Sequence, residues 1–313
     1  MNLTIRPLTE NDLPAAGRIV RLAFGTFLGA PEPEKFWADL DYAHTRWRAD
    51  PLAAFGAERD GTLVGSNFAT RWGSVGFFGP LTVRPDLWNQ GLGKRLMEPI
   101  MALFDTWGVA HAGLFTFAHS PKHVGLYQHY GFWPRALTAI MSKTVQPREP
   151  SGPWTTYSEV PEGAQADCVQ ACGALTAALY DGLDVARELR ATHEQSLGDT
   201  VLLWEADTLV GFGVCHCGSG TEAGTGKCYV KFGAVRLGPT AGALFERLLD
   251  ACEGLAGTRG LSRLEAGVNM ARHEAYRTML AHGFRTDIQG VAMHRHNEPG
   301  YNRPGVYLID DWR

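Results

Sequence analysis

A glycine-containing turn in the first half of the chain joins a predicted strand to a predicted helix. The strand ends with Leu81, Thr82 and Val83, and the helix has apolar residues at helical spacing from Leu96 to Trp107. The first turn of a helix has unpaired N–H groups and a partial positive charge, and glycine lets a ligand approach that backbone closely. The turn therefore predicts a phosphate-binding site made by Gln90, Gly91, Leu92, Gly93, Lys94 and Arg95.

The spacing of the glycines excludes two common phosphate-binding motifs. A P-loop has four residues between its glycines and a Ser or Thr after its lysine, whereas Lys94 is followed by Arg95. A dinucleotide-binding fingerprint has a third glycine where this chain has Leu96. On the glycines alone, an ordinary tight turn between a strand and a helix is an alternative interpretation.

A second segment has the same order of strand, turn and helix. Apolar residues 114–117 predict a strand, Ser120 follows it, and a short helix leads to the sequence YQHYGF at 127–132. This sequence and WNQGLG at 88–93 resemble the two motifs of the GNAT acyltransferase family, Y-x-x-x-G-F and (R/Q)-x-x-G-x-(G/A). The sequence IRPLTENDL at 5–13 also resembles the first strand and helix start of that family, so the resemblance covers residues 1–145.

The resemblance implies a fold, a co-substrate and a set of site residues. The fold is of the α/β class, with a twisted, mostly antiparallel mixed sheet, a splayed central strand pair and flanking helices. The co-substrate is acetyl-CoA, with its pantetheine arm along Leu81, Thr82 and Val83 and its pyrophosphate at residues 90–95. Ser120 stands where the family has an asparagine that contacts the cofactor. Tyr127 stands where the family has the acid that protonates the departing thiolate, a role that contributes about 10²- to 10⁴-fold in rate.

Two of these assignments have alternatives. Trp88 replaces the usual Arg or Gln of the cofactor motif, so the backbone amides and Lys94 or Arg95 would have to hold the pyrophosphate. Tyr127 is otherwise a core residue that packs a helix onto the sheet, although Tyr130 can fill that role instead.

The acceptor side of the predicted site is less defined. The predicted strand at 76–83 has no carboxylate, although some members of the family have a glutamate base there. The remaining candidates for a base are a water chain to solvent and the side chains of Glu58, Asp60, His119 and His123. Aromatic residues between 36 and 47 predict either a lid over a small amine or an amphipathic helix packed on the sheet.

The second half of the chain repeats the first with a period of about 150 residues. We therefore predict an N-terminal GNAT domain at 1–145, a proline-rich linker at 146–153 and a degenerate GNAT-like domain at 154–313. In the second copy Pro239 removes an N–H donor from the turn that would hold phosphate, and Met279 stands where the first copy has Tyr127. We expect this half to act as a scaffold that covers a sheet edge and shapes the acceptor cleft, with a second intact acyl-CoA site as the alternative.

Composition limits the class of protein. The 313 residues are 45% hydrophobic and 20% charged, which is typical of a globular protein, and no apolar run reaches membrane-spanning length. Residues 1–150 hold 15 Lys and Arg against 13 Asp and Glu, a balance of +2, and residues 151–313 hold 14 against 20, a balance of −6. Neither half has the basic stripe of a nucleic-acid-binding protein. We expect a cytoplasmic protein that binds neither nucleic acid nor membrane, with a homodimer as the candidate assembly.

All six cysteines lie in the second half. Cys215 and Cys217 share one face of a predicted strand, so a zinc site with Cys228 is conceivable. We favour the alternative that these cysteines are small buried side chains in a reducing compartment, and expect no metal.

These observations predict an acetyltransferase that moves an acetyl group from acetyl-CoA to a small primary amine by direct attack in a ternary complex. A non-catalytic CoA-binding sensor or scaffold protein is the alternative, because Trp88 departs from the cofactor motif and no base is evident.

Overall fold

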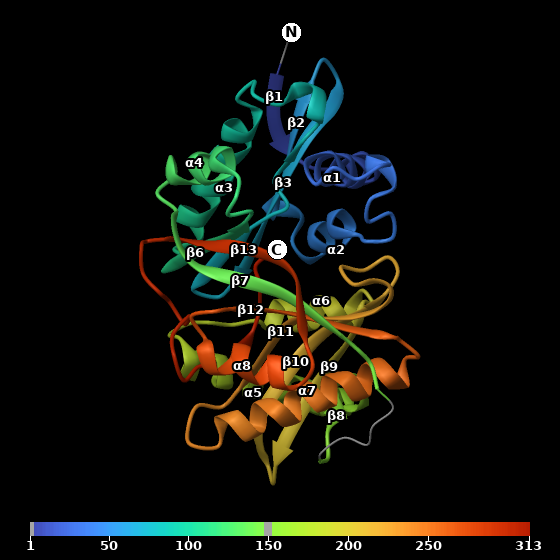
Figure 1. Cartoon of the computed structure of the whole chain (residues 1–313), viewed down its shortest axis with the longest axis vertical. Coiled ribbons are helices and arrows are strands. Elements are labelled where there is room, and N and C mark those ends of the chain that lie inside the picture. The colour runs from blue at the N-terminus through green and yellow to red at the C-terminus, as the bar shows by residue number, and fades with distance from the viewer. Residues whose placement is uncertain (1–2, 147–151) are drawn as a thin grey trace.

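The computed structural model describes residues 3–146 and 152–313, so the predicted linker lies largely outside the described residues. The first half, in the upper part of Figure 1, has four α-helices: α1 (Leu13–Phe27), α2 (Tyr42–Ala49), α3 (Leu92–Trp107) and α4 (Pro121–Gln128). Its strands are β1 (Leu3–Pro7), β2 (Ala54–Arg59), β3 (Thr62–Trp72), β4 (Val75–Phe78), β5 (Thr82–Val83), β6 (His111–Thr116) and β7 (Trp133–Thr144).

The second half occupies the lower part of Figure 1. Its helices are α5 (Glu162–Leu179), α6 (Ala186–Glu194), α7 (Ala241–Thr258) and α8 (His273–Ala281). Its strands are β8 (Thr155–Thr156), β9 (Gly198–Glu205), β10 (Thr208–Gly218), β11 (Gly224–Val235), β12 (Arg263–Asn269), β13 (Arg285–Arg295) and β14 (Leu308–Ile309). The mixed, mostly antiparallel sheet and its flanking helices confirm the predicted fold class.

Helices cover both faces of the sheet in each half. In the first half, α1 and α2 lie on one side of the strands and α3 and α4 on the other (Figure 1). The apolar stripe of α3 is buried as its spacing predicts, at Leu96, Met97, Ile100 and Phe104, and this helix ends at Gly108 with a left-handed backbone. In the second half, α7 packs over one face of β10 and β11 and α5 packs over the other.

The two halves exchange their last long strands. The continuous sheet has the order β1-β2-β3-β4-β6-β13-β7-β12-β11-β10-β9-β8. Strand β13 comes from the second half but pairs with β6 of the first, and β7 comes from the first half but pairs with β12 of the second. The two exchanged strands also pair with each other, and they cross the middle of Figure 1. Each half of the sheet is therefore completed by a strand of the other half.

The C-terminal segment, residues 308–313, runs along the junction of the halves. Strand β14 pairs with β11, and Asp311 and Trp312 then pack over two glycines, Gly267 of β12 and Gly113 of β6. A Cβ atom at either glycine would collide with the side chain above it. Both glycines follow an alanine in equivalent strands of the two repeats, so the repeat leaves matching space for this segment.

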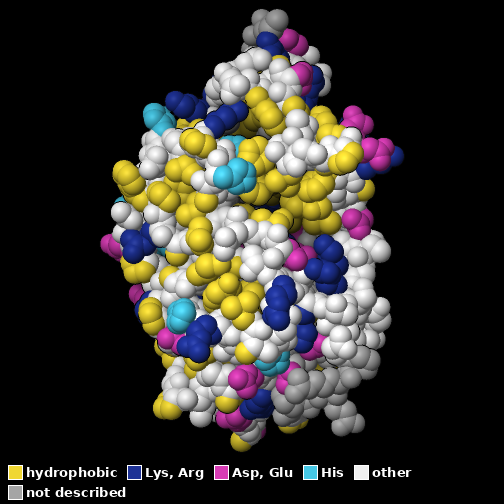
Figure 2. Space-filling view, in the orientation of Figure 1, with side chains coloured by type: hydrophobic (Ala, Val, Ile, Leu, Met, Phe, Trp, Pro, Cys, Tyr) yellow, Lys and Arg dark blue, Asp and Glu magenta, His cyan; other side chains and the backbone are white. Residues whose placement is uncertain are grey.

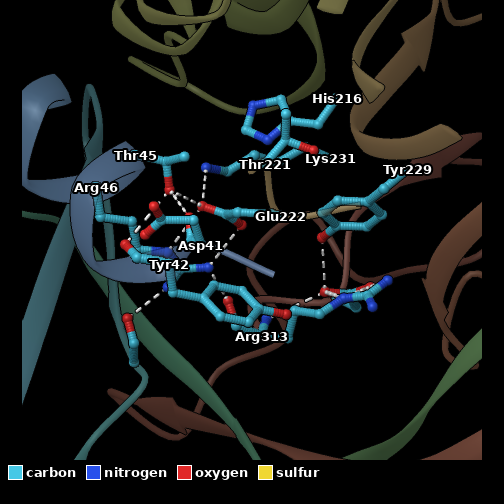
Figure 3. A network of polar contacts seen from close by, with 12 residues as sticks. Asp41, Tyr42, Thr45, Arg46, His216, Thr221, Glu222, Tyr229, Lys231 and Arg313 are labelled. Atoms are coloured by element: carbon cyan, nitrogen blue, oxygen red, sulfur yellow. Dashed lines mark hydrogen bonds and ion pairs between the residues drawn. The ribbon is translucent and has the colours of Figure 1, made fainter. Parts of the chain in front are cut away.

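A buried network of charges joins α2 to the second half (Figure 3). Arg46 donates to both carboxylate oxygens of Glu222, at 3.0 and 2.9 Å, and Glu222 also accepts from Lys231 at 2.8 Å. The Arg46 and Glu222 side chains are 3% and 0% exposed. Burial disfavours the charged carboxylate, but Arg46 and Lys231 outweigh that effect and hold the pKa of Glu222 well below its usual value. Because the network is buried, loss of one partner leaves an uncompensated charge.

We therefore predict that Glu222→Gln lowers the free energy of unfolding by about 3 kcal/mol or more, since Arg46 loses its carboxylate partner inside the protein. Urea unfolding followed by circular dichroism measures this difference. The matched control is Glu205→Gln, because Glu205 pairs with Arg247 at 2.7 Å but its side chain is 57% exposed. Such an exposed pair contributes about 1 kcal/mol or less. Equal losses in the two variants would contradict a stabilising role for the buried network.

Candidate functional site

The central parallel strands of the first half separate after a short paired region. Strand β4 pairs with β6 from Val75 to Phe77, and the pairing ends there. The chain then turns away at Gly79 and Pro80: proline has no N–H to donate, and the Gly79 carbonyl accepts a hydrogen bond from Arg46. The predicted strand 76–83 is thus two strands, since Thr82 and Val83 form β5 on the edge of β3.

A cavity of about 1280 Å³ occupies the opening between these strands. It exceeds the roughly 300–1,000 Å³ of common small-molecule pockets, so it has room for a long ligand and a second molecule. Figure 2 shows this face of the protein hollowed among the hydrophobic side chains of its upper part. The predicted site residues that line the cavity are Leu81, Thr82, Val83, Gly91, Leu92, Gly93, Lys94 and Tyr127.

The N-terminus of α3 opens onto this cavity. Gly91 is the N-cap residue and has a left-handed backbone with φ +80°, which favours glycine. The N–H groups of the first helical turn have no partner within the helix, and they carry the positive end of its dipole. A Cβ at Gly93 would make only an ordinary contact with Leu126, so the space next to Gly93 is open to a ligand. This end of the cavity can bind an anion.

Trp88 and Lys122 form a pair beside the α3 N-terminus. The Trp88 indole N–H donates to the Val83 carbonyl at 2.8 Å, and the Lys122 ammonium lies 5.3 Å from the centre of the Trp88 ring. Both side chains line the cavity. Lys122 therefore brings a cation to the place where the cofactor motif lacks its usual Arg or Gln. Sequence reasoning missed this residue, although its position in the first turn of α4, just after Ser120, was a signal.

Tyr127 lies where α4 meets the separated strands. Its ring packs edge-on against Phe78, with 5.6 Å between ring centres, and the residue is 8% exposed. Burial raises the pKa of Tyr127 above its usual value, so at neutral pH the phenol is protonated, as an unperturbed tyrosine also is. Tyr130 is placed differently, because its hydroxyl donates to the Lys94 carbonyl at 2.7 Å. Tyr127 thus both packs in the core and lines the cavity, whereas Tyr130 ties α4 to α3.

Three predicted binding residues lie outside the cavity lining. Gln90 accepts a hydrogen bond from Arg59, and Arg95 donates to the Leu3 carbonyl. Ser120 is the N-cap residue of α4, and its hydroxyl accepts from the His123 backbone N–H at 3.4 Å. The structure gives each of them a structural contact within the protein.

The candidate bases are distributed unevenly. Glu58, Asp60 and His119 do not line the cavity. Glu58 accepts a 2.8 Å hydrogen bond from Arg6. The His119 ring stacks on Phe27. His123 does line the cavity, and burial, followed by the nearby Lys122, lowers its pKa. Among the described residues, the carboxylates that line the cavity are Glu265 and Asp287, both from the second half.

The corresponding opening in the second half is filled by the chain itself. Strands β11 and β12 pair in parallel from Lys227 to Val230 and then separate, as β4 and β6 do. Strand β14 pairs with β11 at Gly233 and Ala234 and contacts β12 on its other side. In the first half the equivalent edge, residues 79–83, faces the cavity. The second opening therefore holds residues 308 and 309 in the place where a ligand would lie.

The cysteines belong to the core of the second half. Cys215 lies 3.9 Å from Cys252, and Cys217 lies 3.9 Å from Cys228, measured between sulfur atoms. The described part of the chain has no group of three or more His, Cys, Asp or Glu side chains placed to hold a metal ion. Among the same residues, no helix is long and apolar enough to span a membrane.

Comparison with known proteins finds a family match for part of the chain. Residues 19–132 match the acetyltransferase (GNAT) family. A Pyrococcus horikoshii protein assigned as an acetyltransferase is similar in structure, with a TM-score of 0.72, 14% identity and coverage of 99% of this chain and 95% of that one. A GCN5-related N-acetyltransferase from Sphaerobacter thermophilus has a TM-score of 0.59 at 18% identity, covering 95% of this chain and 96% of its own.

A third similar structure is a tandem GNAT protein from the clavulanic acid biosynthesis pathway, with a TM-score of 0.58 and 14% identity over 94% of this chain and 98% of that one. A search of curated proteins by sequence finds no match. Residues 19–132 of this chain thus match the GNAT acetyltransferase family, and the whole chain has the fold of these solved structures, which include a tandem GNAT protein.

Proposed function

We propose that this protein transfers an acetyl group from acetyl-CoA to a small primary amine by direct attack in a ternary complex. The observation that carries the proposal is the single cavity that joins the α3 N-terminus, the edge of residues 81–83 and Tyr127. These are a phosphate site, an extended edge and a proton donor, which are the three parts that an acyl-CoA donor needs. The family match of residues 19–132 supports this use of the cavity.

The cofactor would lie along the first half of the cavity. Its pyrophosphate is placed at the N–H groups of Gly91 to Gly93, with Lys94 and Lys122 as the nearby cations. Its pantetheine amides are placed along Leu81, Thr82 and Val83, where the strand edge turns away from β6. Backbone donors suit this role because they are fixed before the ligand arrives and need little reorganisation.

The chemical step requires one bond to form and one to break. The neutral amine attacks the thioester carbonyl carbon, and the carbon–sulfur bond then breaks as the carbonyl re-forms. The departing sulfur takes a proton from the Tyr127 hydroxyl, and the proton that the attacking nitrogen loses as the amide forms restores that hydroxyl, so the step ends with Tyr127 protonated again. The acceptor ammonium must first lose a proton, and the acceptors for that proton are water in the cavity and His123, the predicted base that lines it.

We predict that Tyr127→Phe lowers kcat by about 10²-fold or more while the KM for acetyl-CoA stays nearly constant, because the ring is kept and only the proton donor is lost. Thiol release during turnover of a panel of amines measures both constants. Tyr130→Phe is the matched control, since the Tyr130 hydroxyl donates to the Lys94 carbonyl and Tyr130 does not line the cavity. An unchanged kcat in Tyr127→Phe under conditions where the chemical step limits the rate would remove Tyr127 from the mechanism.

We also predict that Gly93→Val weakens CoA binding by at least about tenfold, equivalent to about 1.4 kcal/mol, because its side chain enters the space assigned to the pyrophosphate. Gly93 is a better test than Gly91, where the positive φ would strain any substituted residue. Gly163→Val is the control, since Gly163 is likewise the second residue of its helix and has open space around its Cβ position. Calorimetry with CoA that finds the same affinity in both variants would disprove this placement.

A further inference from the structure

The second half supplies the charged wall of the cavity. The charged side chains that it places on the lining are Lys227, Arg263, Glu265, Asp287 and Arg313. The first half lines the cavity near this wall with aromatic and apolar side chains of α1 and α2 and the segment between them, including Phe24, Trp37 and Tyr42. A molecule held between the two halves would thus meet an apolar surface on one side and ionised groups on the other.

Two of these five charged groups, Arg313 and Glu265, form an ion pair with each other. Arg313 is paired with both Glu265 and Asp311, and its guanidinium lies over the Tyr229 ring at 4.0 Å. The Arg313 and Glu265 side chains are only 12% and 10% exposed. Burial disfavours ionisation of Glu265, but Arg313 and then Lys227 outweigh it and keep its pKa low. This ion pair is part of the wall itself and leaves little of its charge for a ligand.

The side chains of Lys227 and Arg263 are more exposed to solvent than those of Arg313 and Glu265. Their side chains are 36% and 46% exposed, so both can contact a ligand without losing all their water. They are register partners on the adjacent parallel strands β11 and β12, which places the two cations on one face about 5 Å apart at the backbone. Figure 2 shows Lys and Arg side chains below the hydrophobic surface on this face of the molecule.

Among the charged side chains that line the cavity here, the more exposed ones are mainly cations. Lys227 contacts Glu265 at 3.3 Å, but that carboxylate is only 10% exposed and is also paired with Arg313. Arg263 contacts Asp287 at 3.1 Å and donates to the Ser142 hydroxyl at 2.9 Å, which fixes the direction of its guanidinium. Nearby Asp39 accepts from the Thr225 backbone N–H and does not line the cavity. On the cavity lining, the two exposed cations Lys227 and Arg263 therefore stand against one exposed carboxylate, Asp287.

We propose that Lys227 and Arg263 bind an anionic group of the acceptor, so the acceptor is an amine that also carries a carboxylate or a phosphate. This proposal rests on the proposed acetyl transfer and names its substrate class. The amine faces the thioester near Tyr127, the apolar part of the acceptor lies against the aromatic side chains of the first half, and its anion pairs with the second half. The second repeat thereby selects the acceptor that the first repeat acetylates.

Matched acceptors test the proposal. Each set has one carbon skeleton with a primary amine and, at the other end, a carboxylate, a phosphate or a neutral carboxamide. We expect kcat/KM to be at least about tenfold higher for one of the anions than for the carboxamide, because a charge-assisted hydrogen bond contributes more than a neutral one. The anion that is preferred distinguishes carboxylate from phosphate. Equal use of the anions and the carboxamide overturns the proposal.

Variants locate the effect. Lys227→Met and Arg263→Met should each raise KM for the anionic acceptor about tenfold and leave both kcat/KM for the carboxamide and KM for acetyl-CoA unchanged. Lys35→Met is the control, because Lys35 is 72% exposed, pairs with Glu32 and does not line the cavity. A rise in KM for acetyl-CoA would show that these cations bind the cofactor instead, and an equal loss with all acceptors would show a structural role; either result overturns the proposal.

A binding measurement separates this proposal from the acetyl transfer on which it rests. The probes are the matched acid and phosphate without the amine, titrated calorimetrically into the CoA complex of the wild type and of the Lys227→Met, Arg263→Met double variant. Saturable binding of a probe that is lost in the double variant supports the anion site. If a probe binds in this way but no amine is acetylated, acetyl transfer fails while the anion site stands. If neither probe binds the wild type, the anion site fails whether or not amines are acetylated.

Discussion

Neither half of the sheet can be completed by its own strands. Strand β13 is held between β6 and β7, so the first half closes on a strand whose sequence lies at the far end of the second half. Strand β7 in turn supplies the neighbour of β12. A sheet edge left without its partner exposes backbone N–H and C=O groups, and the exchange covers both edges at once. The exchange, together with the buried Arg46–Glu222 pair, fixes the second half against the cavity of the first.

In that arrangement the two repeats have similar structures but different roles. Both contain a parallel strand pair that separates, at β4 and β6 and at β11 and β12. In the first repeat Arg46 donates a hydrogen bond to the Gly79 carbonyl, and Pro80 has no N–H to donate. The two strands therefore stay apart, and the opening between them faces the cavity. In the second repeat β14 fills the opening, and the same segment continues to Arg313 in the cavity wall. The opening of the second repeat is therefore filled, and residues of this repeat form a wall of the cavity of the first repeat.

The sequence predicted those features that depend on local chemistry. These features are the glycine turn, the apolar stripe of α3 and the placement of Tyr127 four residues before a Gly-Phe pair, and each depends on a short segment. The predicted residues Leu81, Gly93 and Tyr127 line one cavity. Contacts between residues that are far apart in the sequence could not be predicted from it. Arg46 and Glu222 are 176 residues apart, and the alternation of apolar residues in β13 says which face is buried but not which strand is its neighbour. Lys122 is a candidate for the phosphate site because α4 places its ammonium next to the Trp88 ring, a contact that the sequence alone does not show.

The stoichiometry of CoA binding tests the central claim most directly, because the claim is that one of two related openings is a cofactor site and the other is filled by the chain. Isothermal titration calorimetry of the full chain with CoA measures it without need of an acceptor. The account predicts one site per chain, in the opening between β4 and β6. Two equivalent sites per chain would contradict it, since CoA could enter the second opening only by displacing β14.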